Sequence, residues 1–224
     1  MQKSFDKLNF LTAGMPLRTG KGSYPKAFDI LKDMELDGME LEFVHGVRMS
    51  EESRGFVKEC SNNFIITAHG PFYINLNSKE EDKVEASVQR IIDTAAVASQ
   101  AGAFSITYHA AFYMGKDKET VYNQVKMQTK RICDVLEREN IKVWVRPETT
   151  GKATQWGDID EIVNLSKEFE QVLPCIDFSH LHARSAGEYN TYDEFSYVLE
   201  KIGKELGQYL SLIHISEPTR HLRI

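Results

Sequence analysis

Short apolar segments alternate along the chain with longer segments whose apolar residues recur at helical spacing. The short segments have the length and composition of buried strands, and they span residues 9–13, 39–44, 64–69, 105–109, 141–148 and 172–176. The longer segments predict helices over residues 24–35, 50–60, 80–101, 118–139, 158–168 and 191–206. Successive strand-then-helix units of this kind predict a parallel sheet with right-handed crossovers.

Four consecutive strands of this pattern end on, or run directly into, a residue that can bind a metal ion. These residues are His69, His109, Glu148 and Asp177. Two topologies fit the units, a doubly wound open sheet and an incomplete eight-fold barrel. Consecutive strand ends point at one axial spot only in a barrel, whereas an open sheet spreads them along a line. The sequence therefore favours an α/β fold of the (β/α)8 TIM-barrel type, incomplete, with about six βα units present.

The segment from Pro174 to Ser185 holds the densest cluster of potential metal ligands. It contains Asp177, His180 and His182, and we expect Asp177 and His180 to lie on the loop that leaves the sixth strand. Imidazole and carboxylate groups without cysteine suit zinc, manganese or iron better than a structural thiolate site. One histidine at a strand end more often makes a hydrogen bond than binds a metal. A metal site is favoured because all four strand ends carry a residue that can bind a metal ion.

Composition narrows the class of protein further. The chain has 224 residues, 42% hydrophobic and 27% charged, which is ordinary for one globular domain. No apolar run approaches the roughly 18 residues of a membrane span and the first residues do not resemble a signal peptide, so we expect a cytoplasmic protein. The cysteines Cys60, Cys133 and Cys175 are too widely spaced for a disulfide framework, and we expect buried, reduced thiols. The net charge of -6 counts weakly against DNA as a partner, because metal ions and a local basic patch can replace global charge.

Four motifs resemble those of a known enzyme family. They are AHGPFYINL at residues 68–76, YHAAFY at 108–113, RPETTGK at 146–152 and CIDFSHLHAR at 175–184. In this order they resemble the endonuclease IV family, the family-two apurinic/apyrimidinic endonucleases within the xylose-isomerase-like TIM barrels. The resemblance is strongest to the archaeal-type branch, and it covers residues 8–207.

The resemblance implies a metal-dependent hydrolase that cuts DNA 5′ to abasic sites in base-excision repair. In the family, up to three zinc ions and a metal-activated hydroxide carry out the reaction. The metal ligands implied by position are His69, His109, Glu148, Asp177 and His180. The catalytic residues that the resemblance implies are Glu148, as a bridging carboxylate, and Asp177. Manganese or another divalent metal also suits this ligand set.

Further motif residues are expected to contact the substrate, DNA that contains an abasic site. Phe72 and Tyr73 occupy the place where the family inserts side chains at the abasic gap, and an aromatic wedge replaces the stacking lost when a nucleotide is extruded. A hydrophobic rim over the barrel mouth explains the two aromatic residues equally well. The residues expected to bind substrate are Phe72, Tyr73, Asn75, His182 and Arg184.

The last residues depart from the family pattern. The family takes further ligands from a seventh and an eighth strand, and such a barrel typically needs about 250 residues. Residues 210–220, LSLIHISEPTR, resemble a translated sequencing adaptor. We therefore expect a partial barrel over residues 1–209 and non-native read-through over 210–224, and we leave His214 out of the ligands. In the alternative, residues 213–216 form strand seven and His214 is a ligand. The fragment is expected to be inactive, and the complete protein to be a monomer.

A sugar isomerase or epimerase of the same superfamily remains the alternative function. In such an enzyme the barrel holds one divalent ion, and carboxylates move a proton at a carbon next to the carbonyl of a small sugar. The acidic net charge favours this alternative. The aromatic loop at residues 72–76 and the spacing of Asp177 and His180 favour the nuclease.

Overall fold

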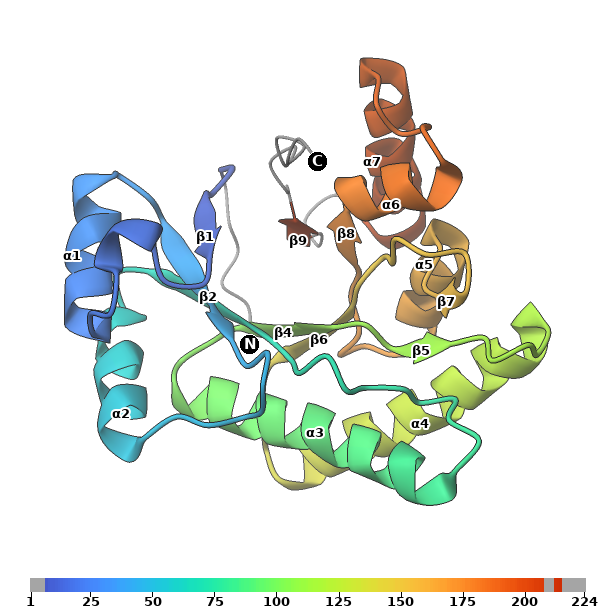
Figure 1. The fold of residues 1–224 in the computed structure, drawn as a ribbon, viewed down its shortest axis with the longest axis horizontal. Coiled ribbons are helices and arrows are strands. Elements are labelled where there is room, and N and C mark those ends of the chain that lie inside the picture. The colour runs from blue at the N-terminus through green and yellow to red at the C-terminus, as the bar shows by residue number, and fades with distance from the viewer. Residues whose placement is uncertain (1–6, 208–211, 215–224) are drawn as a thin grey trace, which may run out of the picture. The chain divides into compact units, whose positions relative to one another are not determined.

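The computed structural model describes residues 7–207 and 212–214 (Figure 1). Strands and helices alternate along the chain, as predicted for an α/β fold. The strands are β1 (Leu11–Ala13), β2 (Gly38–Glu42), β3 (Ile65–His69), β4 (Ser105–Tyr108), β5 (Ala111–Phe112), β6 (Trp144–Pro147), β7 (Gln155–Trp156), β8 (Cys175–Asp177) and β9 (Leu212–His214). The helices are α1 (Tyr24–Asp33), α2 (Glu51–Cys60), α3 (Glu81–Gln100), α4 (Lys118–Arg138), α5 (Ile159–Glu168), α6 (Phe178–Ser185) and α7 (Tyr192–Leu206), with a 3-10 turn, η1, at Leu17–Thr19.

The chain forms two compact units. The first contains the residues up to 74 together with 85–108 and 131–145, and the second contains 75–84, 109–130 and the residues from 146 onward. In the first unit the sheet runs in the order β1-β2-β3-β4 and continues to β6, whose first two residues belong to this unit. The pairings from β1 to β4 are parallel. His69 lies opposite Glu42 on one side and Thr107 on the other, so it stands at the carboxyl end of its strand.

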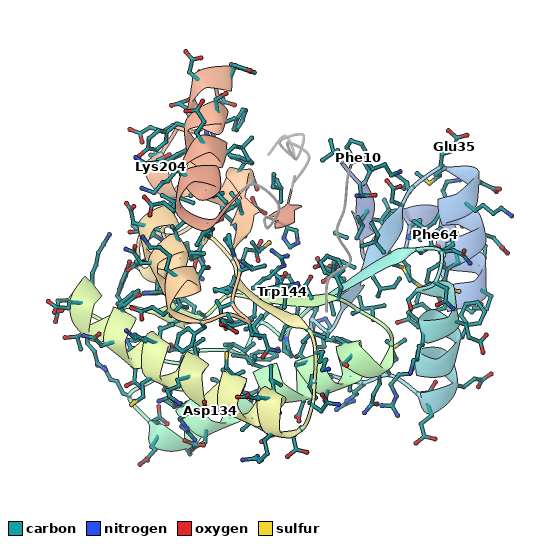
Figure 2. The ribbon with its side chains drawn as sticks, turned by 180° about the vertical axis from the view of Figure 1, so that it is seen from behind. Phe10, Glu35, Phe64, Asp134, Trp144 and Lys204 are labelled. Carbon is teal, nitrogen blue, oxygen red and sulfur yellow. The ribbon has the colours of Figure 1, made fainter. Side chains whose placement is uncertain are left out.

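Aromatic packing joins the first two helices to this sheet. The ring of Phe28 on α1 lies 6.0 Å from the ring of Phe56 on α2. It also lies 5.1 Å from the ring of Phe64, which precedes β3 and is labelled in Figure 2. Removing a side chain of this size from water contributes about 1.5–3 kcal/mol. The three rings therefore fix α1 and α2 against the start of β3.

In the second unit a single bridge continues the succession of strands. Glu148, directly after β6, forms a parallel bridge with Cys175 of β8. The next strand, β9, pairs in parallel with β8 and places His214 opposite Asp177. This neighbour-by-neighbour parallel order is the one found in an eight-fold barrel, and the barrel is incomplete over the described residues. The short strands β5 and β7 form a separate antiparallel pair.

A buried guanidinium ties β6 to the start of β8. Arg146 donates a hydrogen bond from Nη1 to the backbone oxygen of Pro174 at 2.9 Å. Burial lowers the pKa of Arg146 to about 10, so the side chain still carries its charge at neutral pH. This hydrogen bond holds the start of β8 beside β6. Arg146 lies two residues before Glu148 in the sequence.

One hydrophobic cluster packs α5, α6 and α7 against β8. Its buried members are Ile159, Val163, Ile176, Leu181, Val198 and Ile202. Both α5 and α7 begin with a reciprocal capping box, formed by Asp158 with Glu161 and by Thr191 with Glu194. These caps satisfy backbone N–H groups that the first helical turn leaves without partners.

The structure corrects two expectations. The segment after Asp177 is helix α6 and not a loop, because the Asp177 side chain accepts the backbone N–H of His180 and so caps a helix. None of the three cysteines forms a disulfide bond, but only Cys175 is fully buried, while Cys60 and Cys133 are half-buried. Among the described residues, no helix has the length and apolar character needed to cross a membrane.

The hydrophobic cluster leads to a stability prediction. Ile202→Ala should lower the free energy of unfolding by about 2–5 kcal/mol, because it opens a cavity at a side chain that is only 3% exposed. Leu199→Ala on the same helix is the control, since Leu199 is 43% exposed and its loss should cost less than about 1 kcal/mol. Urea unfolding followed by circular dichroism measures both. Equal losses in the two variants would contradict the packing described for α7.

Candidate metal centre

Ligand-type residues of the second unit meet at Glu148, whose side chain is 2% exposed. Its Oε2 atom lies 2.9 Å from Nε2 of His109. Its Oε1 atom lies 2.8 Å from Nδ1 of His214 and 3.7 Å from Nδ1 of His180. An ionised carboxylate that is buried this completely is unfavourable unless positive charge or hydrogen-bond donors surround it. The imidazoles meet that requirement by donating hydrogen bonds to Glu148 or by sharing a cation with it.

Asp177 provides a second buried carboxylate, and it also starts helix α6. Its Oδ1 atom accepts the backbone N–H of His180 at 2.8 Å and the hydroxyl of Ser179 at 2.5 Å. Its Oδ2 atom lies 3.8 Å from Nδ1 of His180. The cap therefore occupies one carboxylate oxygen and sets the other beside the histidine on the first turn of the helix.

A backbone carbonyl orients the imidazole of His180. The Nδ1 atom lies 2.8 Å from the carbonyl oxygen of Thr149, which can only accept, so the proton of a neutral ring belongs on Nδ1 and the lone pair on Nε2. Histidines that bind metals are commonly held by a hydrogen bond of this kind. The side chain of Thr149 also accepts the backbone N–H of Asp177 at 2.8 Å. Thr149 alone thus orients both Asp177 and His180.

The donor atoms of the second unit fit a divalent cation. In one set, Glu148, Asp177 and His180 place potential ligand atoms within 4.8 Å of one another, and in a second set Glu148, Cys175 and His214 do the same. Glu148 belongs to both sets, which is the position of a bridging carboxylate. Mixed imidazole and carboxylate donors suit zinc or manganese. The ring of His109 lies 5.1 Å from the ring of His180, so it adjoins the first set.

His214, which the sequence analysis left out of the ligands, lies in the described segment 212–214. There it forms part of β9 and contacts Glu148, as the alternative interpretation with a seventh strand requires. The interpretation of residues 210–224 as adaptor read-through concerns the origin of the sequence and stays a prediction. Most of that stretch, residues 210–211 and 215–224, lies outside the described residues.

Three predicted site residues lie in the first unit. His69 ends β3, and its Nδ1 atom lies 2.8 Å from the backbone oxygen of Gly70, which again places the lone pair of a neutral ring on Nε2. Phe72 and Tyr73 follow in the next loop and are 62% and 63% exposed. The backbone oxygen of Tyr73 accepts a hydrogen bond from Arg90 at 2.9 Å. That His69 shares a metal with the ligands of the second unit stays a prediction.

The other residues expected to bind substrate hold loops of the second unit in place. The Oδ1 atom of Asn75 accepts two backbone N–H groups, at 3.1 and 3.2 Å. The Nδ1 atom of His182 donates to the backbone oxygen of Glu188 at 2.8 Å. The Nη1 atom of Arg184 donates to three oxygens of the segment 150–155. Contact of these three side chains with substrate stays a prediction.

Sequence reasoning missed two residues that shape this site, Thr149 and Gly151. A Cβ atom on Gly151 would lie 3.2 Å from Cδ2 of His180, so glycine lets the loop run directly against the imidazole. Both residues follow Glu148 within the motif RPETTGK. A hydroxyl residue and a glycine so soon after a ligand were the available signal, but only the structure shows what they touch.

Sequence comparison assigns the family. A profile described as xylose isomerase-like TIM barrel matches residues 28–224. The uncharacterized protein MJ0133 of Methanocaldococcus jannaschii is 47% identical over 201 residues, which cover 90% of this chain and 72% of that protein. The chain therefore belongs to the xylose isomerase-like TIM-barrel family.

Two more distant relatives carry endonuclease names. An apurinic-apyrimidinic endonuclease of Caenorhabditis elegans is 26% identical over 158 residues, covering 68% of this chain and 39% of that protein. An endonuclease 4 homolog of Dictyostelium discoideum is 22% identical over 182 residues, covering 77% and 33%. The matches span well under half of either relative.

Solved structures of two kinds of enzyme share the fold. The 3-keto-D-glucoside 4-epimerase YcjR of E. coli superimposes with a TM-score of 0.70 at 17% identity, covering 94% of this chain and 80% of that one. Endonuclease IV of Thermus thermophilus gives a TM-score of 0.67 at 19% identity, covering 89% and 72%. At these identities the likeness establishes the fold alone.

The contact between Gly151 and His180 gives a direct test of the site geometry. Gly151→Ala should weaken zinc binding by about 10-fold, because the added methyl group pushes the imidazole away from Glu148 and Asp177. Competition with a coloured chelator measures the affinity. Gly55→Ala is the control, since a Cβ atom there meets nothing within 4 Å. Unchanged affinity in Gly151→Ala would show that His180 is not a ligand.

Proposed function

We propose that this chain carries the metal centre of an endonuclease IV-like phosphodiesterase, which hydrolyses DNA 5′ to abasic sites in base-excision repair. The observation that carries the proposal is the buried Glu148 carboxylate, with His109 on one oxygen and His180 and His214 on the other. A shared carboxylate among imidazoles suits a centre of more than one zinc ion. The sequence similarity to the Caenorhabditis elegans apurinic-apyrimidinic endonuclease supports the choice of substrate.

A divalent cation held there, zinc in this proposal, supplies Lewis acidity that activates water and stabilises negative charge on the leaving oxygen. The residues of the chain prepare the place for it. Glu148 and Asp177 contribute negative charge. Their burial excludes water and so strengthens the attraction between that charge and a cation. His109 and His180 add imidazole nitrogens, one beside each oxygen of Glu148. His69 completes the ligand set in the proposal, on the strength of the sequence motif.

We assign contact with abasic DNA to the exposed pair Phe72 and Tyr73. Two adjacent aromatic side chains that are more than 60% exposed present flat apolar surface that can stack where a base is missing. His182 is the second candidate for substrate contact, on the same helix as His180. The protein acts in this proposal as a monomer in the cytoplasm, where its thiols stay reduced.

Glu148→Gln gives the test of function. The product of the source gene, read from its DNA through to its stop codon, is assayed with zinc on a duplex carrying one abasic analogue. The wild-type product should nick the strand 5′ to the lesion. Glu148→Gln should lower the rate by at least about 100-fold, more than is usual for residues that only orient ligands. Glu200→Gln, an exposed carboxylate on α7, is the matched control and should leave the rate unchanged.

The same preparation is offered a ketohexose with manganese. Epimerisation that Glu148→Gln abolishes, with no nicking, would replace the nuclease by the isomerase alternative. Neither activity in a folded, metal-loaded product would contradict both. Nicking that survives in Glu148→Gln would show that Glu148 is not the catalytic carboxylate.

A further inference from the structure

Arg184 makes a dense set of hydrogen bonds away from the ligand atoms. Its Nη1 atom donates to the hydroxyl of Thr150 at 3.1 Å and to the backbone oxygens of Lys152 at 2.7 Å and Gln155 at 2.8 Å. Its Nη2 atom lies 3.3 Å from the hydroxyl of Tyr113. Nη1 carries two hydrogens, so three acceptors occupy it completely. A guanidinium held in this way is built into the loops around it.

Tyr113 extends this network to helix α5. Its hydroxyl donates to Glu161, whose two carboxylate oxygens lie 2.7 and 2.8 Å away. Glu161 is 7% exposed and also accepts the backbone N–H groups of Gly157 at 2.9 Å and Asp158 at 3.0 Å. Burial, followed by the neighbouring Glu161, raises the pKa of Tyr113, so the hydroxyl keeps its proton and remains a donor.

The network links the three segments that carry the ligands of the second unit. Tyr113 lies four residues after His109 and belongs to the same connection between β4 and α4. The three acceptors of Nη1 of Arg184 lie on the segment that begins with Glu148. Arg184 itself lies on α6, one helical turn after His180. These segments are far apart in sequence, and the polar side chains of the network join them.

We propose that Arg184 and Tyr113 are positioning residues, which hold the segments bearing His109, Glu148 and His180 at the separation that a divalent cation requires. In this proposal Arg184 acts through the loop and not through a substrate phosphate. Its planar fork reaches several oxygens at once, which a lysine ammonium on its flexible stem does not reproduce. The inference rests on the metal centre proposed above.

Cobalt binding tests the inference without any need for catalysis. The wild-type chain, Arg184→Lys, Tyr113→Phe and the control Lys167→Ala are titrated with Co²⁺, and the affinity and the visible absorption spectrum are recorded. Lys167 forms an exposed ion pair with Glu205 in the same unit, so its removal matches the loss of polar contacts without touching the network. Urea unfolding of the metal-free proteins gives their stability separately.

The two network variants should bind Co²⁺ about 10- to 100-fold more weakly than wild type, with an altered spectrum, and Lys167→Ala should bind normally. Tyr113→Phe loses one hydroxyl and keeps the ring, so it decides the question if Arg184→Lys fails to fold. Wild-type affinity and spectrum in Tyr113→Phe, or lowered stability with unchanged affinity, would overturn the positioning role. A wild-type chain that binds no Co²⁺ would instead refute the metal centre itself.

Discussion

A carboxylate removed from water needs compensation, and Glu148 is the least exposed carboxylate among the residues that the structure describes. Its side chain is 2% exposed, with imidazole nitrogens 2.8 and 2.9 Å from its two oxygens. Leaving such a group without a partner costs several kcal/mol. The histidines around it are therefore tied to the folding of the second unit as well as to its chemistry. A cation shared among them meets the same electrostatic requirement.

The backbone around Glu148 is arranged to keep this cluster in place. Glu148 itself bridges to β8, so its carboxylate and that of Asp177 are set by neighbouring strands. Asp177 then caps α6, and Thr149 aligns both Asp177 and the ring of His180. Capping and strand pairing are ordinary devices of folding, and here they fix the directions of ligand atoms. Fold and site are thus two consequences of the same hydrogen bonds.

The sequence predicted the strands and long helices well, because apolar periodicity over ten or more residues is a strong signal. It also predicted that ligand-type residues end consecutive strands, since strand ends are recognisable and histidine there is distinctive. Helix α6 was missed because its eight residues carry no clear apolar stripe, and its start depends on a hydrogen bond from Asp177. The sequence predicted that Arg184 binds substrate, and only its hydrogen bonds show which loop it holds. Such contacts join segments distant in sequence, where local patterns carry no information.

Anomalous diffraction at the zinc edge, from crystals grown with zinc, can show whether Glu148 is the shared ligand of a divalent metal centre. If it is, a peak lies about 2.0–2.2 Å from a carboxylate oxygen of Glu148 and from a nitrogen of His109 or His180. A fully occupied zinc elsewhere, with Glu148 still paired to its histidines and no peak beside it, would show that Glu148 is not a ligand.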